Sequence, residues 1–369
     1  MLCRVDIKLA FCKLLRVNAA AFSRKKAVLL AALTQKRPWR LLCVSTWLAL
    51  ALACAGPAVR QESGMEYARW FSILQDGSVV LRTPGGDADT LRGPFRRMVC
   101  MSSSYVGFLE AIGADSTVAG VSGLQFLGNR KVNAIEAGYD AALNYEAILL
   151  ARPDLFLTYS VSSAEPPYLA RLRELGIRCA TVSEHLESHP LARAEYVKLF
   201  GALTGREAAA DSVFSAVRDR YLALVQPSAT KKVLINIPYA SQWFIPGGDN
   251  YMTRLIRDAG GILLGAVPGK QESSVIGLET AYAFAQEADV WLHPGWCETR
   301  EQLRAVHPLF SEFPVLEKDV WNNTLQRTPG GGNRFWETGP VRPDWVLEDL
   351  TRIFSGSVTD SLHYYLPVE

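Results

Sequence analysis

The sequence predicts an α/β protein with two Rossmann-like lobes, each built on a parallel sheet, joined by a long rigid α-helix, with a ligand cleft between the lobes. Three observations carry this prediction. From residue 97 onward, apolar strand-like runs alternate with helical segments, which is typical of parallel sheets. A plan of glutamate, short apolar helix, acidic residue and buried strand occurs twice, at 144–159 and at 277–296. Between the two copies, residues 191–226 keep helical apolar spacing without a strand-like break.

The first 53 residues differ from the rest and form a predicted signal or leader. They contain ten Lys or Arg and one acidic residue, and they end in an apolar run of 13 residues at 41–53, which is short for a membrane span and typical of a secretory signal. A downstream start codon or an unusually long leader would each account for the basic residues that precede this run. Cys54 follows Ala51 to Ala53 and resembles the lipidated cysteine of bacterial lipoproteins, although that signal prefers Leu where Ala51 stands. We therefore favour lipidation of Cys54 over a buried or free thiol.

Charge and cysteine content limit the function classes of the remaining chain. Without residues 1–53 the net charge is about −7, which argues against a nucleic-acid partner or broad attraction to anionic lipid. Beyond Cys54 only Cys100, Cys179 and Cys297 remain, without CxxC spacing, so the sequence predicts no disulfide framework. The hydrophobic content of 49% excludes wholesale disorder.

The elements follow one another in an order that divides the chain. Residues 54–95 are expected to form a lipid-anchor tether and an N-terminal hairpin, with a turn at Asp76 and Gly77. An N-terminal lobe is predicted at 96–190, a linking helix at 191–226 and a C-terminal lobe at 227–369. The expected strands lie at 98–101, 118–121, 155–159, 179–182, 232–237, 290–292, 315–316 and 320–321, and the main expected helices at 103–112, 146–151, 167–175, 251–259, 280–287 and 343–354.

The order of these motifs resembles a known family. Glu146 with the Arg-Pro-Asp at 152–154, the long central helix, the Ala-Gly-Gly at 259–261, and Glu279 before 288–290 are together similar to the periplasmic substrate-binding proteins of ABC importers for iron-siderophores, haem and cobalamin. The resemblance covers roughly residues 97–354, and the chain end looks like a subgroup common in Bacteroidetes-type bacteria. It implies a monomeric, membrane-anchored lipoprotein of the periplasm that has no cofactor and no enzymatic activity.

The resemblance also implies a partner. In that family one surface glutamate of each lobe docks on arginines of the ABC permease, and Glu146 and Glu279 stand at the matching positions. A guanidinium group fits a carboxylate bidentately, so two separated pairs would fix orientation as well as affinity. A glutamate in a first helical turn also complements the helix dipole, which is the better explanation for either residue alone. The matched pair favours docking.

Large, partly flat ligands need aromatic walls with a few polar groups. Phe126 and Tyr239 are more typical of packing against their own lobes, and Arg334 fits either a ligand carboxylate or a solvated loop. His185 and His189 lack a third ligand nearby, and His293 could touch a ligand or ligate a haem iron but reads more simply as a loop histidine, so no metal site is predicted. The predicted ligand-binding residues, which follow strands or lie in loops, are Tyr105, Tyr159, Trp243, Trp296, Asn322, Asn333, Arg334 and Trp336.

Two other function classes stay open at this stage. A chelatase-like or metal-dependent enzyme could share the two-lobed fold, although the export signal and the lack of a catalytic acid, base and metal cluster argue against it. A surface adhesin or structural lipoprotein would have no concave aromatic cleft. The sequence does not choose among siderophore, haem and corrinoid, because all three demand aromatic surface.

Overall fold

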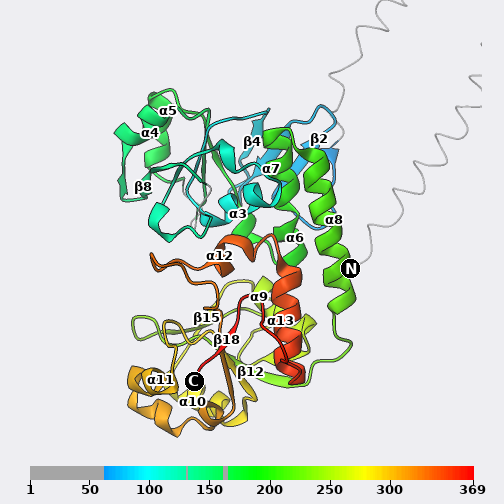
Figure 1. The fold of residues 1–369 in the computed structure, drawn as a ribbon, viewed down its shortest axis with the longest axis vertical. Coiled ribbons are helices and arrows are strands. Elements are labelled where there is room, and N and C mark those ends of the chain that lie inside the picture. Colours follow the sequence, from blue (N-terminus) through cyan, green and yellow to red (C-terminus); the bar gives the residue numbers. More distant parts are fainter. Residues whose placement is uncertain (1–61, 130–131, 161–164) are drawn as a thin grey trace, which may run out of the picture. The chain divides into compact units, whose positions relative to one another are not determined.

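The computed structural model describes residues 62–129, 132–160 and 165–369. The predicted leader, Cys54 and most of the predicted tether lie outside these residues. Within the described part of the chain, no helix is both long enough and apolar enough to cross a membrane. The fold is mixed α/β with two parallel sheets, which confirms the predicted fold class (Figure 1).

The first sheet has five parallel strands in the order β11-β10-β5-β6-β7. Its central strands are continuous apolar runs, and all residues of β10 and β6 are buried, as expected for strands covered on both faces. Short β8 and β9 form a separate antiparallel pair. The elements are β5 (Met98–Cys100), α3 (Ser103–Ala111), η1 (Asp115–Thr117), β6 (Val118–Val121), η2 (Leu124–Phe126), β7 (Ile135–Glu136), β8 (Gly138–Tyr139), β9 (Ala142–Leu143), α4 (Tyr145–Ala151), β10 (Leu155–Thr158), α5 (Tyr168–Glu174), β11 (Cys179–Thr181) and η3 (Glu184–Leu186).

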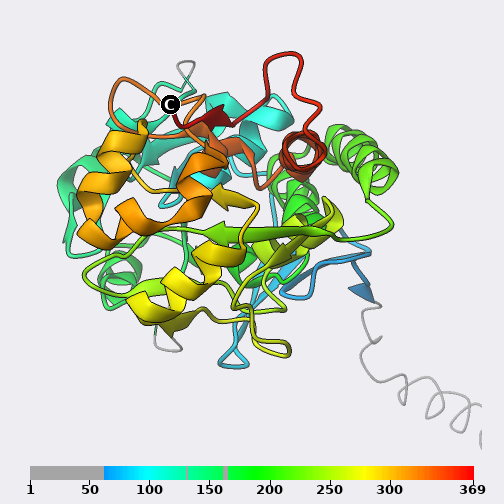
Figure 2. The same ribbon diagram turned by 90° about the horizontal axis from the view of Figure 1, so that it is seen from below.

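The second sheet has the order β14-β12-β16-β17-β18, with β18 antiparallel to β17. Figure 2, seen from below, brings the helices of this lobe to the front. The predicted strand at 315–316 is a 3₁₀ turn, which begins at Pro314. The elements are β12 (Lys231–Ile235), β13 (Trp243–Ile245), α9 (Tyr251–Asp258), β14 (Gly261–Leu263), β15 (Ser274–Ile276), α10 (Leu278–Glu287), β16 (Val290–Leu292), α11 (Arg300–Val306), η4 (Pro308–Glu312), η5 (Pro314–Glu317), β17 (Asp319–Asn322), α12 (Arg334–Thr338), α13 (Pro343–Ser355) and β18 (Leu366–Pro367).

The segment that links the sheets consists of three helices where the sequence predicts one. These are α6 (Pro190–Ala194), α7 (Tyr196–Thr204) and α8 (Glu207–Leu224). Gly205, with φ of 70°, takes the left-handed conformation that ends α7, and the hydroxyl of Thr204 donates back to the carbonyl of Phe200. Helices α7 and α8 therefore lie side by side, and α13 also packs along α8 (Figure 1). The 18-residue α8 is the longest helix of the described chain.

An N-terminal antiparallel sheet packs on this linking segment. Its four strands are β1 (Glu62–Ser63), β2 (Phe71–Leu74), β3 (Val79–Arg82) and β4 (Ala88–Leu91), in that order, and β2 and β3 form the expected hairpin. Glu195 is fully buried, and its carboxylate accepts hydrogen bonds from the backbone N–H groups of Glu66, Tyr67 and Ala68 at 2.8–2.9 Å. The buried Glu187 accepts two more, from Arg69 and Trp70. Two carboxylates thus hold the chain that leads into β2.

Replacing Glu195 by Gln should destabilise the protein. The new amide NH₂ would face backbone donors where the carboxylate oxygen accepted hydrogen bonds, so we expect the free energy of unfolding to fall by about 2–4 kcal/mol. The exposed Glu312 supplies a matched control, because its change to Gln should alter stability by less than about 0.5 kcal/mol. Urea unfolding followed by circular dichroism measures both. Equal stability of the two variants would contradict this account of Glu195.

Candidate functional site

Two cavities that share lining residues lie where loops of the two lobes face each other. We call them together the interlobe cleft. The larger, of about 510 Å³, is lined by Ser103 and Phe126 from the first lobe and by His293 and Trp296 from the second. The smaller, of about 290 Å³, is lined mainly by the first lobe. Ser103 and Trp336 line both cavities. The cleft therefore lies beyond the carboxyl ends of parallel strands, where open α/β sheets bind ligands.

Aromatic rings with free surface stand in the larger cavity. Trp296 is 58% exposed, Trp336 50% and Phe126 39%. The chain after β16 turns through His293, with φ of 54°, and Gly295, with φ of 63°, and this turn keeps Trp296 out of the core. Phe126, which the sequence analysis assigned to packing within its lobe, is a cleft residue in the structure.

Two side-chain amides of the larger cavity, those of the buried Asn322 and the half-buried Asn333, hold its loops in place. The side-chain NH₂ of Asn322 donates to the carbonyls of Gly295 and Cys297 at 3.0 and 2.9 Å, and so fixes the loop that carries Trp296. The amide of Asn333 caps α12 and donates to the carbonyl of Asn323 at 2.8 Å. Asn322 and Asn333 both line the cavity, as expected, but their side-chain NH₂ groups donate to backbone carbonyls and so position the loops.

A segment of the second lobe packs on the first and forms one wall of the cleft. We call residues 323–339, which include α12, the strap. Glu337 is 1% exposed, and its carboxylate accepts hydrogen bonds from the backbone N–H groups of Gly128 and Asn129 at 2.7 and 3.1 Å. A Cβ atom on Gly107 of α3 would lie 1.9 Å from the carbonyl oxygen of Glu337, so this close packing requires glycine. The strap carries Trp336 into both cavities.

Arg334 occupies a different place from the one predicted. Its guanidinium group bonds to both carboxylate oxygens of Glu110, at 2.9 and 3.0 Å, and to Glu337 at 3.1 Å. It lines a separate cavity behind the strap, away from Trp296. Arg334 therefore joins the lobes, because its partner Glu110 lies on α3, and its guanidinium group serves this contact and does not face a ligand in the interlobe cleft.

Trp243 is also misplaced by the sequence prediction. It lies in β13, is 1% exposed, and donates from Nε1 to the carbonyl of Ile235 at 2.8 Å. Its ring stacks on Trp291 and Phe313, with centroids 5.9 and 6.3 Å apart. The Pro-Gly-Gly that predicted a loop follows β13 and does not include Trp243.

The two predicted tyrosines line the smaller cavity but differ in access. Tyr105 is 1% exposed, and its hydroxyl donates to the carbonyls of Thr158 and Val182. Tyr159 is half-buried, and its ring meets that of His185 edge-on, with centroids 5.9 Å apart. Burial raises the pKa of Tyr159, with a further contribution from the nearby Asp140. Tyr159 therefore offers a neutral phenol to the cleft at neutral pH.

The histidines near the cleft are held in the neutral form. Nε2 of His293 lies 2.7 Å from the hydroxyl of Tyr365, and burial lowers the pKa of His293 to about 4. Nε2 of His185 lies 3.0 Å from the carbonyl of Ser160, and burial lowers its pKa as well. Within residues 62–129, 132–160 and 165–369, no three His, Cys, Asp or Glu side chains gather in a way that could hold a metal ion.

Glu146 and Glu279 are exposed in the first turns of α4 and α10. The structure gives neither carboxylate an ion pair within the described ranges. Each is accompanied by exposed apolar side chains of its own helix, Leu149 and Leu150 on α4 and Tyr282 on α10. Both glutamates are thus available to a partner.

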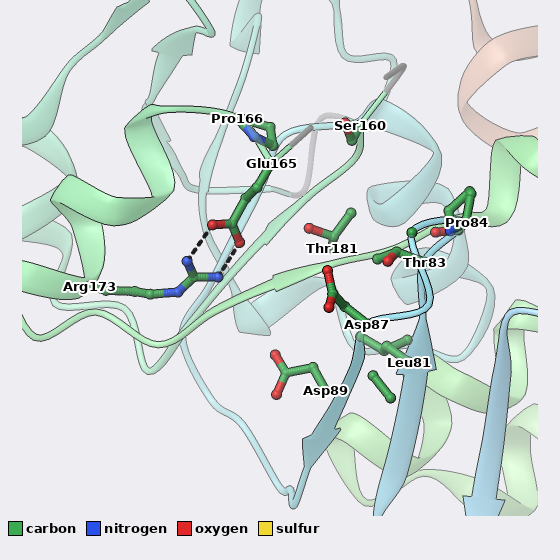
Figure 3. A pocket seen from close by; sticks show the side chains of 13 residues that line it. Leu81, Thr83, Pro84, Asp87, Asp89, Ser160, Glu165, Pro166, Arg173 and Thr181 are labelled. Atoms are coloured by element: carbon green, nitrogen blue, oxygen red, sulfur yellow. Dashed lines mark hydrogen bonds and ion pairs between the residues drawn. The ribbon is translucent and has the colours of Figure 1, made fainter. Parts of the chain in front are cut away.

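A further cavity, of about 390 Å³, lies between the β3–β4 turn and the first lobe (Figure 3). It contains an ion pair in which Arg173 donates to both oxygens of Glu165, at 2.8 and 2.5 Å, and this pairing lowers the pKa of Glu165. Asp87, on the β3–β4 turn, and Asp89, in β4, also line it (Figure 3). The described residues that line this cavity include no aromatic ring and come from the first half of the chain, so the interlobe cleft is the better candidate site.

Comparison with known proteins places the chain among binding proteins. Residues 98–320 match the family described as periplasmic binding protein. An uncharacterised lipoprotein of Methanocaldococcus jannaschii is 26% identical over 307 residues, which cover 76% of this chain and 71% of that protein.

Solved structures share the fold at low sequence identity. A periplasmic binding protein of Veillonella parvula has a TM-score of 0.57 at 16% identity, with 82% of this chain and 99% of that chain covered. A periplasmic haem-binding protein of Pseudomonas aeruginosa has a TM-score of 0.53 at 21% identity, with 74% and 98% covered.

The buried His293 should make stability fall at acid pH. The unfolded chain takes up a proton at this histidine below about pH 6.5, whereas the folded chain does so only near pH 4, so stability is lost as the pH falls between these values. The contribution is roughly 3 kcal/mol at most. His293→Asn, which tolerates positive φ, should lose correspondingly less stability between pH 7 and pH 4.5 in urea unfolding. Parallel pH profiles for the variant and the wild type would show that His293 does not contribute.

Proposed function

This chain belongs to the periplasmic binding protein family, and we propose that it is the substrate-binding lipoprotein of an ABC importer that captures an iron-siderophore, haem or corrinoid ligand and delivers it to the permease. The matched family is described as periplasmic binding protein, and the similar Pseudomonas aeruginosa structure is a haem-binding protein. The Methanocaldococcus relative is described as a lipoprotein, which supports a membrane anchor, for which Cys54 is our candidate. The protein performs no chemistry on its ligand.

The observation that carries the proposal is the aromatic lining of the interlobe cleft. Trp296 and Phe126 come from opposite lobes, and Trp336 stands on the strap between the two cavities. Together they expose ring surface that the core does not use, which suits a large and partly flat ligand. The neutral phenol of Tyr159 adds a polar contact on the first lobe. Asn322 and Asn333 contribute indirectly, because their hydrogen bonds hold the loops that carry these rings.

The strap limits how this cleft can open. Glu337 and Arg334 tie it to the first lobe by buried and half-buried polar contacts, while α8 and α13 run alongside one another. Because these strap contacts and the packing of α13 on α8 both restrain the second lobe, capture requires only a small closure about the ligand. The affinity then comes mainly from preorganised ring surface.

Recognition by the permease is assigned to Glu146 and Glu279. Both are exposed, they lie on helices of different lobes, and the neighbouring Leu149, Leu150 and Tyr282 supply apolar surface beside the charge. Two arginine partners on the permease would bind such a pair bidentately and set the orientation of the complex. A glutamate that only complemented a helix dipole would not need this surrounding apolar surface.

Ligand binding should quench tryptophan fluorescence. We expect a saturable response in titrations with haem, ferric citrate, ferrioxamine B or cyanocobalamin, and a smaller response in a Trp296→Phe, Trp336→Phe variant. Trp345→Phe is the matched control, because Trp345 stacks on His363 outside the cleft and should leave the response unchanged. The absence of any response to all four compounds would refute the proposed function.

The docking glutamates should matter for transport and not for ligand affinity. Changing Glu146 and Glu279 together to Ala should leave the dissociation constant within about twofold and reduce uptake by at least tenfold, since charge-assisted pairs with the permease would be lost. Glu207→Ala is the control, because Glu207 is also exposed in a first helical turn, that of α8. Uptake by cells or proteoliposomes that survives the double change would exclude this docking mode.

A further inference from the structure

One buried donor in the interlobe cleft has no acceptor. Asn323 is 6% exposed and lines the larger cavity. Its backbone N–H donates to the side chain of Asn322 at 3.0 Å, and its carbonyl and side-chain oxygens accept from Asn333 at 2.8 and 3.5 Å. Its side-chain nitrogen Nδ2 has no hydrogen-bond partner among the described residues. A buried donor without an acceptor is costly, so this position favours a ligand that brings one.

The N-terminus of α3 opens into the same cavity. Ser102 caps this nine-residue helix, and its first turn holds no acidic residue. The hydroxyls of Ser102 and Ser104 lie 2.8 Å apart, and that of Ser104 donates to Glu184 at 2.9 Å. Ser103 lines both cavities, and its N–H and hydroxyl find no partner within the part of the chain that the structure describes. A helix N-terminus with a free N–H and hydroxyl favours an anionic oxygen.

The charges around these donors are already balanced within the protein. Glu184 is paired with the buried Arg193 at 2.8 Å. Glu337 is bound by two backbone N–H groups and by Arg334, and Arg327 is paired with Glu298. The helix terminus and Asn323 remain donors without a partner among the described residues, and both kinds of donor suit an oxygen acceptor.

We propose that this end of the cleft binds a carboxylate of the ligand, with Ser103 and Nδ2 of Asn323 as donors. The inference rests on the proposed function and sharpens it. Among metal chelates and tetrapyrroles, this site would favour those that carry a peripheral carboxylate. The flat or apolar body of such a ligand would lie against Trp296 and Trp336. Asn323 was not among the residues that the sequence singled out.

Isothermal titration calorimetry on the purified full-length chain tests this selection. Haem and ferric citrate carry carboxylates, whereas haem dimethyl ester, ferrioxamine B and cyanocobalamin do not. We expect haem or ferric citrate to bind at least tenfold more tightly than any carboxylate-free probe. Tighter binding of a carboxylate-free probe would overturn the inference and leave the proposed function standing. No binding of any probe would refute the proposed function, and the inference with it.

Substitutions at Asn323 test the donor itself. Asn323→Asp keeps the shape but replaces the donor by a negative oxygen, and should weaken binding of the best carboxylate probe at least tenfold. Asn323→Leu removes the donor without adding charge, and should weaken binding while leaving the melting temperature unchanged or higher. Thr351→Val is the control, since the hydroxyl of Thr351 is the other buried group without a partner in the described chain and lies on α13 outside the cleft. Unchanged affinity in a folded Asn323→Leu protein would overturn the proposal.

Discussion

The arrangement of the cleft depends on one buried carboxylate. Glu337 belongs to a segment that follows the second sheet, but its oxygens accept hydrogen bonds from Gly128 and Asn129 of the first lobe. A carboxylate that is 1% exposed is tolerable only when its oxygens are bonded, and here two backbone donors and Arg334 bond them. This attachment turns the strap into a wall of the cleft and places Trp336 between its two cavities.

Close backbone contact supports that attachment. A Cβ on Gly107 would meet the carbonyl of Glu337 at 1.9 Å, and one on Gly332 would meet the carbonyl of Phe126 at 1.8 Å. Glycine at these two positions therefore lets α12 and its preceding loop approach the first lobe at a distance that any side chain would prevent. The same principle operates at the N-terminal sheet, where the buried Glu195 bonds three successive backbone N–H groups. Buried glutamates thus fasten two outlying segments to the fold.

Much of the fold was predictable from local pattern, whereas the site was predictable only in part. The apolar run of β10 and the helical spacing of apolar residues along α7 and α8 indicate directly which residues are buried. For this reason the sheets and most helices lie where the sequence predicts them. The sequence predicts Trp296 in the cleft because Pro-Gly precedes it in the loop that leaves a strand, and in the structure Gly295, with positive φ, turns the chain there. Trp243 and Arg334 were placed wrongly, since their partners Trp291 and Glu110 lie 48 and 224 residues away and leave no local signal.

The sequence by itself determined the α/β class, the two parallel sheets, the linking helical segment and the exposed glutamates in first turns, because each of these depends on periodicity and capping within a few residues. The tertiary structure alone decided that the strap crosses to the first lobe, that Phe126 faces the cleft, and that Asn323 keeps a donor without an acceptor. These features arise from hydrogen bonding and packing between distant segments. Local pattern cannot encode a partner that the chain reaches only after folding.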